Sequence, residues 1–179
     1  MAEKLSVSAA ASIAHALDHR EVVIEREGVS DRSTSGFALL LMDEGIEGES
    51  PPMALLERLA FHLPLDNVPM SCTDKFRVTE SDVSTARHLL PSITVSEEGL
   101  SALNAAALEA GVNSIRALHF CCRAASAHAA LAGRGTVQET DLAIACRLVL
   151  GPRAAIEMPE EEADQDSSPP VPDDDPQEA

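Results

Sequence analysis

The strongest constraint on this sequence is a series of helix start and stop signals in its second half. Between Thr79 and Pro152, four segments each begin with a Ser, Thr or Asn and end at a Gly or a Pro. A side-chain oxygen at the start of a helix accepts hydrogen bonds from the free backbone N–H groups there, whereas Gly and Pro end helices. The pattern therefore predicts a compact four-helix subdomain of about 70 residues, over residues 79–153.

Short motifs place the individual boundaries of these helices. We expect the helices to start at a capping-box-like Thr79–Asp82, at Ser96, at Asn113 and at the capping box Thr136–Glu139, and to end at Pro91, near Gly111, at Gly133 and at Gly151-Pro152.

These helices must pack through small side chains, because only 2% of the chain is aromatic and it contains neither Trp nor Tyr. The third helix is rich in Ala, which allows its neighbours to approach closely. Its apolar residues recur at intervals of three and four, which predicts one buried stripe. The expected members of that stripe are Ile115, Leu118, Cys122, Ala125 and Ala129.

The first half of the chain predicts a smaller part with mixed secondary structure. Val22-Val23-Ile24 precede, and Phe37–Met42 follow, a charged segment with a Gly, Glu25–Ser30, as in a β-hairpin. We expect strands near 21–26 and 36–42, a helix over 6–17, a helix over 53–61 opened by Pro52, and a short strand at 62–65. The predicted fold class is therefore α+β and mostly helical.

The last residues are acidic and rich in Pro. Residues 157–179 hold ten acidic residues, five Pro and no Lys or Arg, so residues 1–156 carry −7 of the formal charge of −17. Such a segment cannot bury enough apolar surface to offset the entropy of ordering, and we expect a disordered tail over 154–179. It is suited to recruiting a basic partner or to spacing domains apart. Before it, we expect a partial α/β core over 1–68, a linker over 69–78 and the helical subdomain.

Several classes of function are disfavoured. The negative charge argues against nucleic-acid binding through phosphate contacts. No apolar run reaches the roughly 18 residues of a membrane span, and the N-terminus has no signal-peptide core. The histidines show no metal-ligand spacing and nothing resembles a nucleophile elbow, so we expect no metal site and no catalytic residue acting alone. The cysteines lack zinc-ribbon spacing and are expected to be free thiols in a reducing cytoplasm: Cys72, Cys121, Cys122 and Cys146.

Two arginines are candidate functional residues. Arg58 lies at the end of the predicted short helix, where an arginine can reach a nucleotide on a neighbouring subunit and stabilise charge on its γ-phosphate. A solvated helix arginine is the alternative. Arg116 opens the third helix, whose positive dipole end gives a cation no local reason to be there. A phosphate would supply that reason, as would a salt bridge to Glu97, Glu98 or another carboxylate.

Taken in order, these segments resemble the AAA+ subunits of magnesium chelatase. Val23–Ser30 is similar to the hairpin of that family, Phe37–Leu41 to its next core strand, and Leu55-Leu56-Glu57-Arg58-Leu59 to its finger segment. Further likeness, to the family's helical lid, lies in Ala86–Ser96, Gly111–Arg116, Arg123-Ala124-Ala125 and Thr136–Leu142. The resemblance covers residues 2–153.

Within that family, two features favour the larger D-type subunit over the ATPase subunit. The ATPase subunit has an Asn-Pro-Glu-Glu-Gly segment whose Asn orients the attacking water, whereas this chain has Met42-Asp43-Glu44-Gly45. The acidic tail resembles the linker before the integrin-like domain of the D-type subunit. The 179 residues contain neither a GxxxxGK[ST] phosphate loop nor the DxSxS motif of that domain.

The resemblance implies the C-terminal part of a AAA+ α/β module, with hairpin and short strands, followed by a four-helix lid. It implies a platform or regulator that does not hydrolyse ATP alone, in the complex that inserts Mg²⁺ into protoporphyrin IX for (bacterio)chlorophyll synthesis. Arg58 would be the arginine finger, Arg116 the sensor-2 arginine, and the hairpin tip a subunit contact; the tip comprises Glu25, Arg26, Glu27 and Gly28.

The partners implied by the resemblance are the ATPase subunit and the porphyrin-binding subunit, in a cytoplasmic ring of like or mixed subunits. MgATP is expected at the subunit interfaces of that complex, and no cofactor on the chain alone. Two alternatives stay open: an active AAA+ ATPase of the chelatase or MoxR type, and a helical interaction module that does not bind nucleotide.

Overall fold

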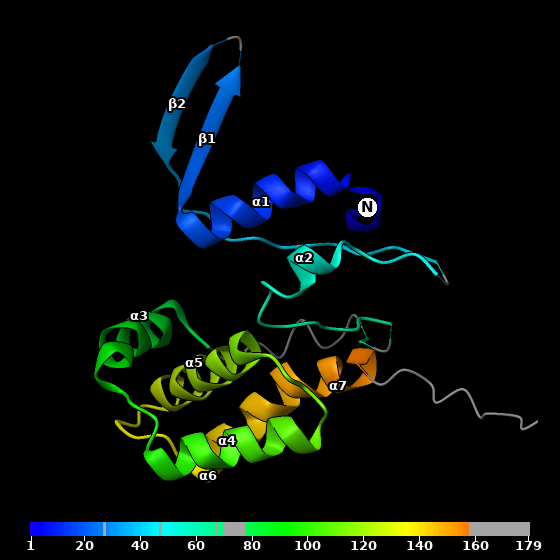
Figure 1. Cartoon of the computed structure of the whole chain (residues 1–179). Coiled ribbons are helices and arrows are strands. Elements are labelled where there is room, and N and C mark those ends of the chain that lie inside the picture. The colour runs from blue at the N-terminus through cyan, green and yellow to red at the C-terminus, as the bar shows by residue number, and fades with distance from the viewer. Residues whose placement is uncertain (27, 47, 67, 70–77, 158–179) are drawn as a thin grey trace, which may run out of the picture.

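The computed structural model describes residues 1–26, 28–46, 48–66, 68–69 and 78–157, which form an N-terminal part and a helical part (Figure 1). The N-terminal part holds a 3-10 turn Ala2–Lys4, α1 Val7–His19, β1 Glu21–Arg26, β2 Val29–Thr34 and α2 Met53–Leu56. The helical part holds α3 Glu80–Leu89, a 3-10 turn Leu90–Ser92, α4 Glu97–Glu109, α5 Ile115–Leu131, α6 Glu139–Ala145, a π-helical turn Cys146–Leu150 and α7 Gly151–Glu157. The predicted α+β, mostly helical fold is confirmed. Most of the predicted linker, and the tail from residue 158, lie outside the described residues.

The β-hairpin is present, but its second strand is not the predicted one. β1 and β2 pair antiparallel from Glu21 opposite Thr34 to Arg26 opposite Val29, so two residues connect them. Gly28 has a φ of 83°, a conformation that Gly adopts without strain in such tight loops. The polar segment directly after the loop therefore pairs with β1, and the prediction of strands at 36–42 and 62–65 is wrong. Leu39 and Leu41 instead pack against α1 and α2.

The core of the N-terminal part is small. Ser6 caps α1 by accepting from the Ala9 N–H at 3.1 Å. Ala10 and Ala14 of α1 pack against Leu55, whose side chain is fully buried. α2 is shorter than the predicted helix over 53–61, because its hydrogen bonds tighten to i→i+3 steps after Leu55.

Caps define the helices of the second half, with two shifts from the predicted positions. The capping box of Thr79 and Asp82 and the cap at Ser96 are confirmed. The cap of α5 is Ser114, one residue after the predicted Asn113. The cap of α6 is Gln138, in a box with Asp141, so the predicted box at Thr136–Glu139 is wrong.

The last helix does not end at Gly151-Pro152 as predicted. A π-helical turn precedes Gly151, whose N–H donates to the Cys146 carbonyl oxygen. α7 then begins, and Pro152 lies in its first turn, where the missing N–H of Pro costs little. Residues 154–157 consequently belong to a helix rather than to the predicted tail.

The helical part is built around the small side chains of α5. Its buried stripe follows four-residue steps and comprises Ala117, Cys121, Ala125 and Ala129. Three predicted members behave differently, because Ile115 in the first turn is 85% exposed and both Leu118 and Cys122 are only half-buried. The stripe packs on α4, α6 and the π-helical turn through Leu103, Ala107, Ala145 and Val149. Among the described helices, none combines the length and the apolar character needed to cross a membrane.

Candidate functional site

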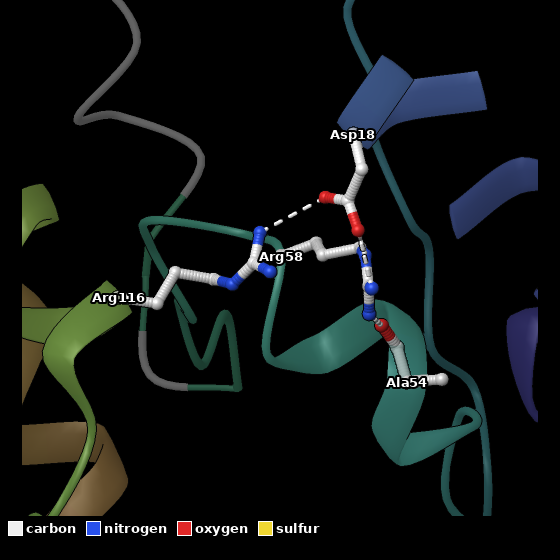
Figure 2. A network of polar contacts seen from close by, with 4 residues as sticks. All are labelled: Asp18, Ala54, Arg58 and Arg116. Atoms are coloured by element: carbon white, nitrogen blue, oxygen red, sulfur yellow. Dashed lines mark hydrogen bonds and ion pairs between the residues drawn. The ribbon is translucent and has the colours of Figure 1, made fainter. Parts of the chain in front are cut away.

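Three charged side chains meet where the N-terminal part faces the helical part (Figure 2). Asp18 lies in the last turn of α1, Arg58 follows α2, and Arg116 is the second residue of α5. Arg58 donates to Asp18 Oδ2 from Nε at 3.0 Å and from Nη2 at 2.5 Å. Arg116 Nη1 donates to Asp18 Oδ1 at 3.0 Å. Each carboxylate oxygen therefore binds one of the two arginines that the sequence marks as functional candidates.

Local structure gives each residue of this triad a reason for its position. Arg58 Nη1 also donates to the Ala54 carbonyl oxygen at 2.7 Å, which fixes its guanidinium against α2. Hydrogen bonds from Arg58 lower the pKa of the Asp18 carboxyl; partial burial opposes this effect, and Arg116 adds to it. Asp18 is therefore an anion at neutral pH, held by two cations from elements 40 and 98 residues away.

The triad is accessible and carries a net positive charge. The side chains of Arg58, Asp18 and Arg116 are 20%, 28% and 43% exposed. Two guanidinium groups share one carboxylate, so one positive charge is not neutralised within the triad. Guanidinium N–H groups match the oxygen geometry of phosphates, and a solvent-accessible cationic pair of this kind is suited to a phosphate-bearing ligand.

A further arginine joins the two parts of the molecule nearby. Arg153 of α7 is 6% exposed and donates through Nη1 to the carbonyl oxygens of Val149, at 2.7 Å, and Ala60, at 3.1 Å. Its Nη2 donates to the Leu59 carbonyl oxygen. The segment that directly follows Arg58 is thus bound to the helical part, which holds Arg58 within reach of Arg116.

The comparisons with known proteins agree with this architecture. Residues 100–176 match the model of the AAA lid domain. The magnesium-chelatase 67 kDa subunit of Chlorobaculum tepidum is 32% identical over 93% of this chain and 30% of its own length. The corresponding subunit of Heliobacterium mobile is 30% identical over 78% of this chain and 24% of its own. The 60 kDa subunit of Cereibacter sphaeroides is 33% identical over 65% of this chain and 21% of its own.

The chain belongs to the family of the D-type subunits of magnesium chelatase. It spans 30% or less of the length of the three relatives named above. In this member of the family, the residues that match the lid model begin within α4 and include α5 to α7, whereas α1, the hairpin, α2 and α3 precede the match.

The structure of this chelatase-family chain brings together two of the predicted site residues and separates the others. Arg58 and Arg116 share Asp18, so the carboxylate partner of Arg116 is neither Glu97 nor Glu98. The hairpin starts at Glu21, three residues after Asp18, and its tip projects away from α1 (Figure 1). Glu25 and Gly28 are exposed near its tip, Arg26 ends β1, and Glu27 lies outside the described residues.

Sequence reasoning missed Asp18 and Arg153. An acidic residue in the last turn of a helix is unfavourable for the helix dipole, and that signal marks Asp18 as needing a cation. No comparable local signal marks Arg153, because the carbonyl groups of Leu59 and Ala60 that it binds lie far away in the sequence.

A buried acid supports the lid from within. Asp141 is fully buried and accepts from the Gln138 N–H at 2.8 Å, from Arg134 and from His128 Nδ1, which lies 2.5 Å away. Burial acts to raise the pKa of Asp141, but these hydrogen bonds and charges outweigh it and the net pKa is lowered.

Within the described ranges, no three His, Cys, Asp or Glu side chains gather into a metal-binding group. Cys121 is buried as a free thiol, and burial raises its pKa to about 12.

Proposed function

We propose that this chain serves as a non-hydrolysing AAA+ platform or regulator in magnesium chelatase. In this role it supports the insertion of Mg²⁺ into protoporphyrin IX, at the expense of ATP, in the synthesis of (bacterio)chlorophyll. The similarity to magnesium-chelatase subunits supports the proposal. The observation that carries it is the pair of accessible arginines, Arg58 and Arg116, on one carboxylate at the junction of the two parts.

In the proposed complex, these arginines serve MgATP at subunit boundaries. Arg58 acts as an arginine finger toward a neighbouring subunit, because a guanidinium stabilises the charge on a transferring phosphoryl group. Arg116 acts as the sensor-2 arginine, which contacts nucleotide from the lid. ATP supplies the free energy of the reaction, and the chain's own residues bind and orient its phosphates.

The hairpin is the proposed contact with other subunits. All β2 side chains are exposed, and Ile24 of β1 is 57% exposed, so the hairpin presents a long free surface. Its proposed partners are the ATPase subunit and the porphyrin-binding subunit of the chelatase, within a cytoplasmic ring.

Assembly with the ATPase subunit tests this function. The purified chain and a magnesium chelatase ATPase subunit are run together on size-exclusion chromatography with light scattering, with and without MgATP. We expect a larger joint species that depends on MgATP. Separate elution under both conditions would contradict a platform role for this chain.

A further inference from the structure

We propose that Asp18 is an internal competitor for phosphate: it occupies Arg58 and Arg116 until a polyphosphate group displaces it. ATP is assigned as the natural source of that group on the strength of the proposed function. The competition itself is a property of this chain and is testable without any partner.

The geometry of the carboxylate is that of a phosphate substitute. Asp18 presents two oxygens, one accepting two N–H groups of Arg58 and the other accepting one N–H group of Arg116. A phosphate group presents three oxygens with more negative charge, so it can satisfy the same donors and more. Among the described residues, Asp18 Oδ1 is the one hydrogen-bond acceptor shown for Arg116, whose guanidinium has five N–H donors.

The charge balance favours such an exchange. The triad holds two cations and one anion, and it is partly open to solvent. While Asp18 stays in place, the site offers a polyphosphate one net positive charge. Once Asp18 withdraws, the two guanidinium groups offer two positive charges. Both arginines are then engaged by one ligand instead of by the protein itself.

The junction can change at this point without coming apart. Arg153 is buried and binds the carbonyl groups of Leu59 and Ala60, which are not groups that a phosphate replaces. Loss of the Asp18 contacts therefore frees α1 from α5 while the segment after Arg58 stays attached to the helical part.

The test compares the unsubstituted chain with Asp18→Asn, which keeps the size of the side chain and removes its charge. Binding of inorganic tripolyphosphate and of MgATP is measured by calorimetry at low ionic strength. We expect Asp18→Asn to bind tripolyphosphate at least about tenfold more tightly, since a charge-assisted competitor has been removed. The charge-matched control Asp31→Asn, on the exposed β2 strand, is expected to leave binding unchanged. Adding Arg58→Ala to Asp18→Asn is expected to abolish the gain.

The result that overturns the proposal is equal affinity in the unsubstituted chain, Asp18→Asn and Asp31→Asn. Equal gains in both single variants overturn it as well, because they reduce the effect to net charge. If tripolyphosphate and MgATP bind with similar affinity, the site recognises the phosphate chain alone. If MgATP binds more tightly, the site recognises the nucleoside as well.

A second measurement avoids dependence on the folding of Asp18→Asn. In the unsubstituted chain, the Arg58 Nε–H resonance is followed by NMR while tripolyphosphate is added. We expect the Arg58 resonance to shift until the site is saturated, whereas the resonance of the exposed Arg87 should not shift. An unchanged Arg58 resonance would contradict the proposal. A competition that is observed without co-elution with the ATPase subunit would leave this inference standing and refute the proposed function instead.

Discussion

Asp18 and Arg116 each lie at the helix end that disfavours its charge, and they compensate each other across 98 residues. The C-terminal end of α1 carries a partial negative charge next to an acid, and the N-terminal end of α5 a partial positive charge next to an arginine. The two side chains pair at 3.0 Å, so each charge offsets the unfavourable interaction of the other with its helix dipole. The pair is also a contact between the two parts of the molecule.

This contact predicts an acid-sensitive component of stability. The pKa of Asp18 is lowered below its ordinary value of 3.8, so its contribution is complete above that value and is lost as the pH falls through the lowered pKa. We expect Arg58→Ala/Arg116→Ala to lower the free energy of unfolding at pH 7 by about 1 kcal/mol, since the group is partly exposed. Below pH 5, the free energy of unfolding of this double variant is expected to change less with pH than that of the unsubstituted chain. Urea unfolding followed by far-UV circular dichroism measures both.

Loss of the candidate finger is expected to lower activity without unfolding the chain. Arg58→Ala removes the guanidinium that the proposed function places at a neighbour's phosphate, and Arg58→Lys keeps the charge without the planar donors. We expect both to reduce the ATPase and chelatase activities of the reconstituted complex by tenfold or more, in line with the general contribution of such a finger. Arg87→Ala, on the exposed side of α3, is the control. Full activity of both Arg58 variants would show that the residue is no finger.

The buried acid of the lid is expected to contribute strongly to stability. Asp141→Asn leaves Arg134 and His128 without their anion, at a cost of about 3 kcal/mol. Because the pKa of Asp141 is lowered, its contribution is present above the ordinary pKa of 3.8 and is lost on acidification through the lowered value. Urea unfolding at pH 7 checks the magnitude, with the exposed Asp31→Asn as control; a change below about 0.5 kcal/mol would contradict the role of this cluster.

The tight hairpin loop allows a test of the proposed subunit contact. Gly28→Ala forces an L side chain into a φ of 83°, which costs about 1–2 kcal/mol and weakens the pairing of β1 with β2. Gly36→Ala, where a Cβ meets open space and the φ is not positive, is the matched control. We expect weaker binding of the porphyrin-binding subunit to the first variant alone, measured by surface plasmon resonance. Equal binding by both variants would exclude the hairpin from that interface.

Sequence reasoning succeeded where structure depends on neighbours along the chain. The caps at Thr79 and Ser96 are satisfied within three residues, so the sequence alone determines them. It failed at α6, where two capping boxes overlap. Asp141 forms the capping box of α6 because Arg134 and His128 also bind its carboxylate, and those contacts depend on the fold.

The same distinction explains the candidate site. Arg116 stood out because its charge conflicts with its own helix, which is a local property. Its pairing with Asp18, and the presence of Arg58 on the same carboxylate, depend on how α1, α2 and α5 pack. The prediction of the second hairpin strand failed for a related reason, because Leu39 and Leu41 of the predicted strand pack on α1 and α2 instead of extending the sheet.

The buried arginine of α7 is expected to be a main attachment between the two parts. Arg153→Met keeps most of the side-chain volume but leaves the carbonyl groups of Leu59 and Ala60 without this donor. We expect a loss of about 2 kcal/mol in unfolding free energy and faster amide exchange over residues 56–62. Arg147→Met, exposed on the preceding turn, is the control. Unchanged exchange in Arg153→Met would show that the two parts are held together elsewhere.

Arg153 recognises the main chain and not particular side chains at positions 59 and 60. Since every amino acid offers the same carbonyl oxygen, those two positions are free to diverge among relatives without loosening the joint. A substitution at residue 153, by contrast, removes the donor of both hydrogen bonds. We therefore expect evolutionary drift on one side of this joint and constancy on the other.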